Sequence, residues 1–305
     1  MSRVNPIPHA DGQQLVYAAA GHDRTRSPQV FYVNGIRTPP EVHRDVAVKL
    51  SAITERTVIG IYNLHDKLSV QAPFGSFSED GYIADLVFEC IPQWLQAATA
   101  DLGEKLVSRL DAGLRALPGN LDTIRKNGKG LPIAVDLQLR AAAHGARSLQ
   151  ALVDALCTNF PQSVRRTLAD TWVAAWPAAK TLYRLLTSGD HHDAIVVAHS
   201  QGNLITVHAF WAMKLAHGAG FYRNMKVFSL ASPVPAWPDG TWAKLYALTG
   251  DPVAMLSLGR TFRGPGADVK SDVGFAAHDV DRNMQTTEFL RELRRHLGLK
   301  PLGGS

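Results

Sequence analysis

Ser200 lies between a hydrophobic run and a long apolar stretch, in a pattern that suits a reactive hydroxyl. Ala194–His199 is rich in β-forming residues and predicts a strand, whereas Leu204–Met213 has the apolar spacing of a helix. The small residues Ala198 and Gly202 stand two places to either side of Ser200, so the turn can be tight and Oγ can stand clear of the backbone. The first N–H groups of the expected helix would point to the place where an oxyanion develops. We therefore predict a nucleophilic serine, with an ordinary strand-to-helix turn as the alternative.

The hydroxyl of a serine attacks a carbonyl only when a base takes its proton, and that base is oriented by an acid. In this order of elements the acid follows a later strand. Asp251 directly follows the predicted strand Lys244–Leu248, in a Gly-Asp-Pro turn, and is the predicted acid. Asp239, in a Pro-Asp-Gly turn before that strand, and Asp272, with no strand ahead of it, are weaker candidates. The alternative for the Gly-Asp-Pro turn is a carboxylate that caps a helix.

The predicted base is His278, which stands just before the expected C-terminal helix. A neutral imidazole titrates near pH 6.5 and suits proton transfer near neutrality. Three other histidines follow the serine. His208 lies within the helix that begins after it, His217 lies at the end of that helix, and His296 is expected on a solvated face of the terminal helix. The order serine, aspartate, histidine is thus satisfied, with a solvated loop histidine as the alternative for His278.

An oxyanion hole needs two N–H donors. One is expected from Gln201, the residue after the nucleophile, and the other from the loop after an early strand. The strand Gln29–Val33 ends in an Asn-Gly pair, and Gly35 allows the backbone to approach a substrate closely. We predict the N–H of Ile36 as the second donor, with Arg37 as a neighbouring alternative.

These residues are expected to be positioned by a parallel sheet. A strand at Gln29–Val33, a helix that begins at Pro39–Pro40 and a strand at Thr57–Tyr62 form a βαβ unit. Tyr62 and Asn63 end that second strand near the expected pocket, where they either line it or pack in the core. Further elements are predicted at the strands Gln14–Tyr17 and Lys226–Leu230, at a helix over Thr181–Leu186, and at a C-terminal helix from Met284 to Leu297.

Helical periodicity dominates residues 69–179, so we interpret this stretch as a large helical insertion that acts as a cap. Residues 1–68 and 180–305 would then form the core. Trp94, Trp172 and Trp176 lie in the insertion, where packing between cap helices explains them most simply. An apolar lid that binds acyl chains or touches a membrane is the alternative.

Composition excludes several classes of protein. The chain has 305 residues and a net charge of +5 without a long basic run, so nucleic-acid binding is not expected, although weak contact with an anionic membrane surface is left open. Its two cysteines have no metal or disulfide spacing, and the turn at His191–Asp193 offers no third ligand, so no metal is expected. No signal peptide or transmembrane segment is visible. Cytoplasmic residence is therefore expected, with signal-independent export left open.

The chain resembles the α/β-hydrolase superfamily, on its lipase and esterase side. The motifs V-N-G-I at Val33–Ile36 and H-S-Q-G-N at His199–Asn203 resemble those of bacterial hydrolases, some of them similar to secreted lipase effectors. The resemblance covers Gln29–Asn63 and His192–Leu297. It implies an eight-stranded, mostly parallel sheet, a Ser–His–Asp mechanism, cap helices over the pocket and no cofactor. The superfamily often has His-Gly in its first oxyanion loop, where this chain has Asn-Gly.

These observations predict a serine hydrolase that cleaves carboxylic esters through an acyl-enzyme. Lipid or acyl esters are the first expectation for the substrate, because the helical insertion is long and apolar. A small-ester hydrolase or a thioesterase comes second. A catalytically silent hydrolase fold that binds a lipid or a protein partner is the alternative from another class.

Overall fold

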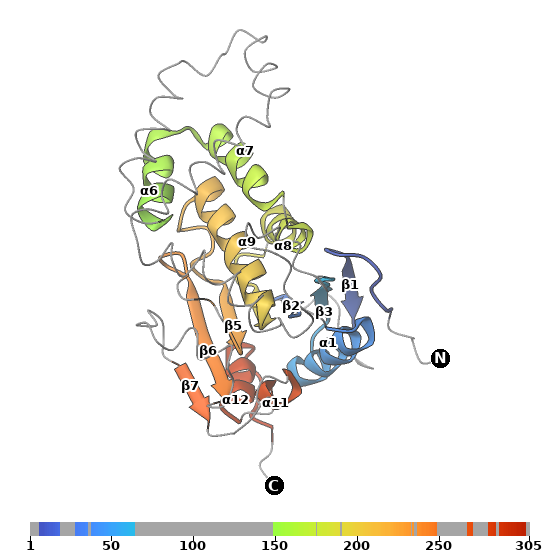
Figure 1. Ribbon diagram of the computed structural model, residues 1–305. Coiled ribbons are helices and arrows are strands. Elements are labelled where there is room, and N and C mark those ends of the chain that lie inside the picture. Colours follow the sequence, from blue (N-terminus) through green and yellow to red (C-terminus); the bar gives the residue numbers. More distant parts are fainter. Residues whose placement is uncertain are drawn as a thin grey trace, which may run out of the picture.

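The computed structural model describes residues 6–18, 28–35, 38–64, 149–174, 176–189, 191–232, 234, 237–248, 267–270, 280–284 and 287–302. These residues form an α/β fold in which helices flank a sheet of seven strands (Figure 1). The strands are β1 (Gln14–Tyr17), β2 (Val30–Val33), β3 (Val58–Ile61), β4 (Ile195–His199), β5 (Lys226–Leu230), β6 (Trp242–Leu248) and β7 (Ala267–Lys270). The helices are α1 (Pro40–Thr54), α6 (Leu149–Asn159), α7 (Gln162–Val173), α8 (Pro177–Ser188), α9 (Gln201–His217), α11 (Val280–Met284) and α12 (Thr287–His296).

The strand order is β1-β3-β2-β4-β5-β6-β7. All neighbouring pairs are parallel except β1 with β3, so the sheet is mixed, with its antiparallel strand at one edge. From β2 the chain moves outward to β3, and from β4 it moves outward in the other direction to β5 and β6. The order therefore reverses between β2 and β4, and ligands of open α/β sheets bind beyond the carboxyl ends of the strands at such a point.

Side chains that alternate along the strands build a core on each face of the sheet. Phe31 and Val33 of β2 pack with α6, α7, α8 and α9 on one face. Val30 and Tyr32 of the same strand pack with α1, α11 and α12 on the other. Among the described helices α9 is the most enclosed, because it lies between the sheet and the layer formed by α6, α7 and α8 (Figure 1).

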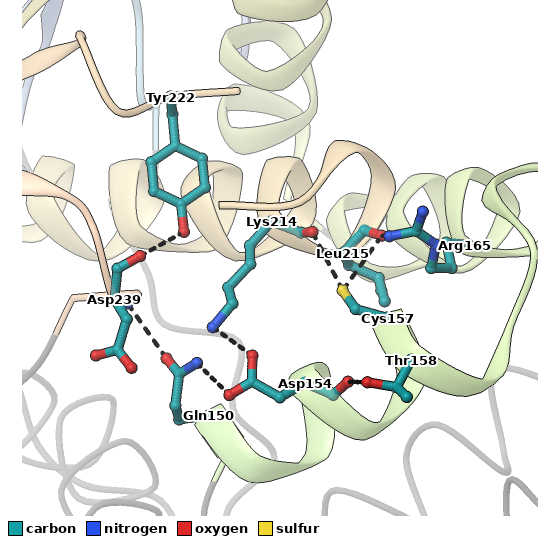
Figure 2. Close-up of polar contacts among 9 residues, drawn as sticks. All are labelled: Gln150, Asp154, Cys157, Thr158, Arg165, Lys214, Leu215, Tyr222 and Asp239. Carbon is teal, nitrogen blue, oxygen red and sulfur yellow. Dashed lines mark hydrogen bonds and ion pairs between the residues drawn. The ribbon is translucent and has the colours of Figure 1, made fainter. Parts of the chain in front are cut away.

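Polar contacts connect α6 to α9 and to the turn before β6 (Figure 2). The buried Lys214 of α9 forms an ion pair with Asp154 of α6, with 2.7 Å between Nζ and Oδ1. Gln150 donates to the same carboxylate and accepts from the N–H of Asp239, whose carbonyl accepts the Tyr222 hydroxyl. Helices α6 and α7 fall within the predicted insertion, yet they share one hydrophobic core with α9.

The predicted elements agree closely with the observed ones. β1 and β5 have the predicted bounds, and β2, β3, β4 and β6 differ by one or two residues at an end. β7 was not predicted, because its short sequence Ala-Asp-Val-Lys is extended through its pairing with β6 rather than by an apolar pattern. The sheet of the described residues has seven strands, where the resemblance implies eight. Among the described helices, none combines the length and apolar character that crossing a membrane requires.

Candidate active site

Ser200 forms the turn between β4 and α9, as predicted. Its backbone has φ 52° and ψ −124°, a conformation that residues with a Cβ rarely adopt. Such a conformation costs of order 1–3 kcal/mol, so it persists only where the surroundings impose it. Backbone strain of this kind gathers at active sites, and the geometry fits the sharp turn that presents a serine nucleophile.

The end of β5 holds this turn in place. The N–H of Ser200 donates to the carbonyl of Leu230 at 3.0 Å. The side chain of Asn203, one turn into α9, donates from Nδ2 to the carbonyls of both Ser200 and Leu230, each at 3.0 Å. Because these groups are buried, the bonds fix the strained residue to the neighbouring strand.

Two glycines let the end of β2 contact the turn. A Cβ on Gly35 would lie 2.8 Å from Cβ of Ser200 and 3.2 Å from Nδ1 of His199. A Cβ on Gly202 would lie 2.4 Å from the carbonyl oxygen of Val33. The loop after β2 therefore approaches the serine closely, as its predicted role in an oxyanion hole requires.

Three buried amide side chains connect the ends of β2, β3 and β4. Asn34 and Asn63 form a reciprocal pair: the Asn34 side chain donates from Nδ2 to the carbonyl of Asn63 and accepts the N–H of Asn63, both at 2.9 Å. The side chain of Asn63 in turn donates from Nδ2 to Oε1 of Gln201 at 2.7 Å. The network lies at the point where the strand order reverses, and it was not predicted.

The loop that follows β2 is also held by hydrogen bonds. The carbonyl of Gly35 accepts from Nδ2 of Asn34 and from Oγ1 of Thr38, each at 2.9 Å. The hydroxyl of Tyr62 donates to the carbonyl of Thr38 at 2.9 Å. These bonds fix the backbone on either side of the predicted donor Ile36. Ile36 itself and its neighbour Arg37 lie outside the described residues.

The N-terminus of α9 gives the site a positive field. The helix has 17 residues and carries no acidic side chain in its first turn. The first N–H groups of a helix have no partner within it and carry its partial positive charge. Ser200 therefore lies where an anion that forms on a substrate would be stabilised.

Four histidines follow Ser200, and the three that the structure describes are poorly placed to act as its base. His217 ends α9, about 24 Å along the helix from its start. His208 stacks on Trp176 of the α7–α8 side at 4.2 Å between ring centroids, and burial lowers the pKa of its imidazole to about 4. His296 packs against Phe228 and Trp242, towards the amino ends of β5 and β6. The side chain of His296 is 23% exposed, so the aromatic rings cover much of it and the face that was expected to be solvated is only partly so.

His43 of α1 is a buried histidine that the sequence did not single out. Its ring lies among Tyr17, Tyr32 and Tyr62, with centroid distances of 5.0–5.7 Å. Gly60 leaves room for it, because a Cβ there would lie 2.5 Å from Nε2 of His43. Neither ring nitrogen has a hydrogen-bond partner in the described part of the chain, and burial lowers the pKa of the imidazole to about 3.

The remaining predicted site residues divide into two groups. Asp251, His278 and Asp272 lie outside the described residues, so their roles stay predictions. Asp239 is exposed in the turn before β6, at the opposite end of the parallel strands from Ser200, which removes it as an alternative acid.

Within the described ranges, no cluster of three His, Cys, Asp or Glu side chains is arranged to hold a metal ion. No protein-family model matches the chain, and neither the curated proteins nor the solved structures gave a significant match.

Proposed function

We propose that this chain is a serine hydrolase of the α/β-hydrolase fold that cleaves carboxylic esters. The observation that carries the proposal is the strained backbone of Ser200, held between a central parallel strand and the N-terminus of a helix. Glu55, which ends α1, has the same φ but a ψ of 35° and so lies in the ordinary left-handed region, whereas the ψ of −124° takes Ser200 outside that region, and strain of this kind gathers at active sites. The close approach of Gly35 supports an oxyanion hole at the same place.

The proposed reaction is an acyl transfer in two steps. Oγ of Ser200 attacks the ester carbonyl while His278, oriented by Asp251, takes its proton. The N–H groups of Gln201 and Ile36 stabilise the tetrahedral oxyanion, which collapses to an acyl-enzyme as His278 gives the proton to the leaving alcohol. Water then attacks the acyl-enzyme by the same route, so the acid is released and the serine is restored.

The substrate class is proposed from the sequence. The apolar residues of 69–179 recur at helical spacing over a long stretch, and such an apolar segment favours an ester with an acyl chain over one with a small acyl group. A fatty-acid ester, either as a simple ester or as part of a phospholipid, is therefore the first substrate to test. The mild positive net charge suits weak contact with an anionic vesicle surface.

A fluorophosphonate probe tests the nucleophile directly. An activated serine attacks its phosphorus and expels fluoride, which leaves a stable adduct. We expect the adduct on Ser200, located by peptide mass spectrometry, and none in Ser200→Ala. This variant should also lower ester turnover by at least about three orders of magnitude. Its melting temperature should stay close to that of the parent, because Ala and Ser share the same backbone cost at φ 52°.

Failure to form the adduct under conditions that label a known serine esterase would exclude the hydrolase and favour a silent fold that binds a ligand. A panel of p-nitrophenyl esters, from acetate to palmitate, separates the substrates if the adduct forms. Preference for acetate, with no response to phospholipid vesicles, would indicate a small-ester hydrolase instead.

A further inference from the structure

We propose that Asn63 is a positioning residue for the oxyanion hole, acting through the side chain of Gln201. This role rests on the proposed function, because it concerns the N–H group that Gln201 would offer to the tetrahedral intermediate. Asn63 follows β3, which is separated from β4 by β2, and so belongs to an element that contributes no predicted catalytic group.

The geometry makes Asn63 a rigid donor. Both polar groups of its backbone are bonded to the side chain of Asn34, with 2.9 Å from its N–H to Oδ1 and 2.9 Å from Nδ2 to its carbonyl. Asn34 is fully buried, and 1% of Asn63 is exposed. Because the backbone is held at both groups and the side chain itself is buried, Nδ2 of Asn63 has little freedom to move.

That fixed donor reaches the first residue of α9. Nδ2 of Asn63 lies 2.7 Å from Oε1 of Gln201, and 3% of Gln201 is exposed. The bond therefore connects the end of β3 to the residue whose backbone N–H is the predicted donor. It acts from the side of the turn opposite to β5, where Ser200 and Asn203 are bonded to Leu230.

The consequence is that the turn is bonded on two sides. The bonds to β5 are made by Ser200 and Asn203, whereas the Asn63 bond holds Gln201, the first residue of α9, from the side of β3. A hydrogen bond to an oxyanion is sensitive to small displacements, and a misplacement of about 1 Å costs up to roughly 100-fold in rate. Asn63 should therefore affect the chemical step more than substrate binding.

A double-mutant cycle tests this role. Asn63→Leu and Gln201→Met each remove the bond with little change in volume, and the double variant removes it once. We expect each single variant to lower kcat and the rate of fluorophosphonate labelling by about 10- to 100-fold, with KM changed less than about threefold. The double variant should lose no more than the worse single variant, because the two side chains act as one unit.

Thr54→Val is the matched control. It removes a buried side-chain hydrogen bond, from Oγ1 to the carbonyl of Leu50, at the end of α1 that leads into the amino end of β3. Its melting temperature should fall, as that of Asn63→Leu is expected to fall, while kcat stays the same. If the role of Asn63 is purely structural, Asn63→Leu will behave like Thr54→Val, with a lower melting temperature and an unchanged kcat.

The outcomes separate this inference from the proposed function. An unlabelled wild type would overturn the proposed function and the role of Asn63 with it. A labelled wild type whose rate is unchanged in Asn63→Leu would overturn the role of Asn63 alone, as would losses that multiply in the double variant. Should Asn63→Leu lack the circular dichroism of a folded protein, Gln201→Met removes the same bond from the other side, and an unchanged kcat there would equally overturn it.

Discussion

The buried imidazole of His43 should make the protein lose stability in mild acid. Its folded-state pKa is about 3, whereas an unfolded chain protonates histidine near pH 6.5. Between these values the unfolded state binds the proton and the folded state does not. The contribution of the neutral imidazole is therefore complete above pH 6.5 and is lost progressively as the pH falls toward 3.

The size of the effect follows from the difference between the two pKa values. Each pH unit below 6.5 costs about 1.4 kcal/mol, so His43 alone should remove about 3 kcal/mol of unfolding free energy between pH 7 and pH 4.5. This is a large part of the 5–15 kcal/mol that typically stabilises a domain.

Urea unfolding at pH 7 and pH 4.5, on the wild type and on His43→Leu, measures the effect. Leucine carries no proton and fits in the volume of the ring, although the variant should be less stable at pH 7 because the contacts with the tyrosine rings are lost. His208, whose pKa is also lowered, is present in both proteins, so its contribution cancels in the comparison. The wild type should lose about 3 kcal/mol more than the variant between the two pH values. Equal losses in the two proteins would refute the reasoning, since the imidazole would then titrate alike in the folded and unfolded chains.

Two further predictions concern packing and charge. Gly202→Ala should lower the melting temperature and the ester activity together, because the new Cβ would lie 2.4 Å from the carbonyl oxygen of Val33. A thermal melt whose midpoint is the same as that of the wild type would contradict this close contact. Asp154→Ala should destabilise the protein by about 3 kcal/mol, because it leaves the ammonium of Lys214 buried without its partner. Lys214→Met should cost less, because the carboxylate that it leaves behind on Asp154 is half exposed. Denaturant unfolding of both variants measures the difference, and a larger loss of stability in Lys214→Met would contradict the prediction.

The sequence was sufficient for the elements that carry Ser200 because each has a strong local signal. β4 is a continuous apolar run, α9 is long and apolar, and the small residues Ala198 and Gly202 stand beside the serine. The Asn-Gly pair after β2 led us to expect that the backbone at Gly35 approaches a substrate, and its close approach to the Cβ of Ser200 is added by the structure. Local patterns of this kind survive without knowledge of the tertiary structure.

The features that were missed depend on which strands become neighbours. Asn34 and Asn63 are separated by 29 positions, and their reciprocal bonds form only because β2 and β3 are adjacent and parallel. A signal was present, since an amide residue follows an apolar strand at both places. His43 was overlooked for a similar reason: the tyrosines that surround it come from β1, from β2 and from the residue after β3.

The enclosure of α9 has a consequence for the synthesis of the chain. Helices α6, α7 and α8 and strands β2 and β4, all of which pack on α9, precede it in the sequence. A nascent chain therefore already contains these partners when α9, the most apolar of the described helices, leaves the ribosome, which shortens the exposure of a surface prone to aggregation. The carbonyl of Leu230, which accepts the N–H of Ser200, belongs to β5, so the turn at Ser200 gains this bond only after α9 has been synthesised.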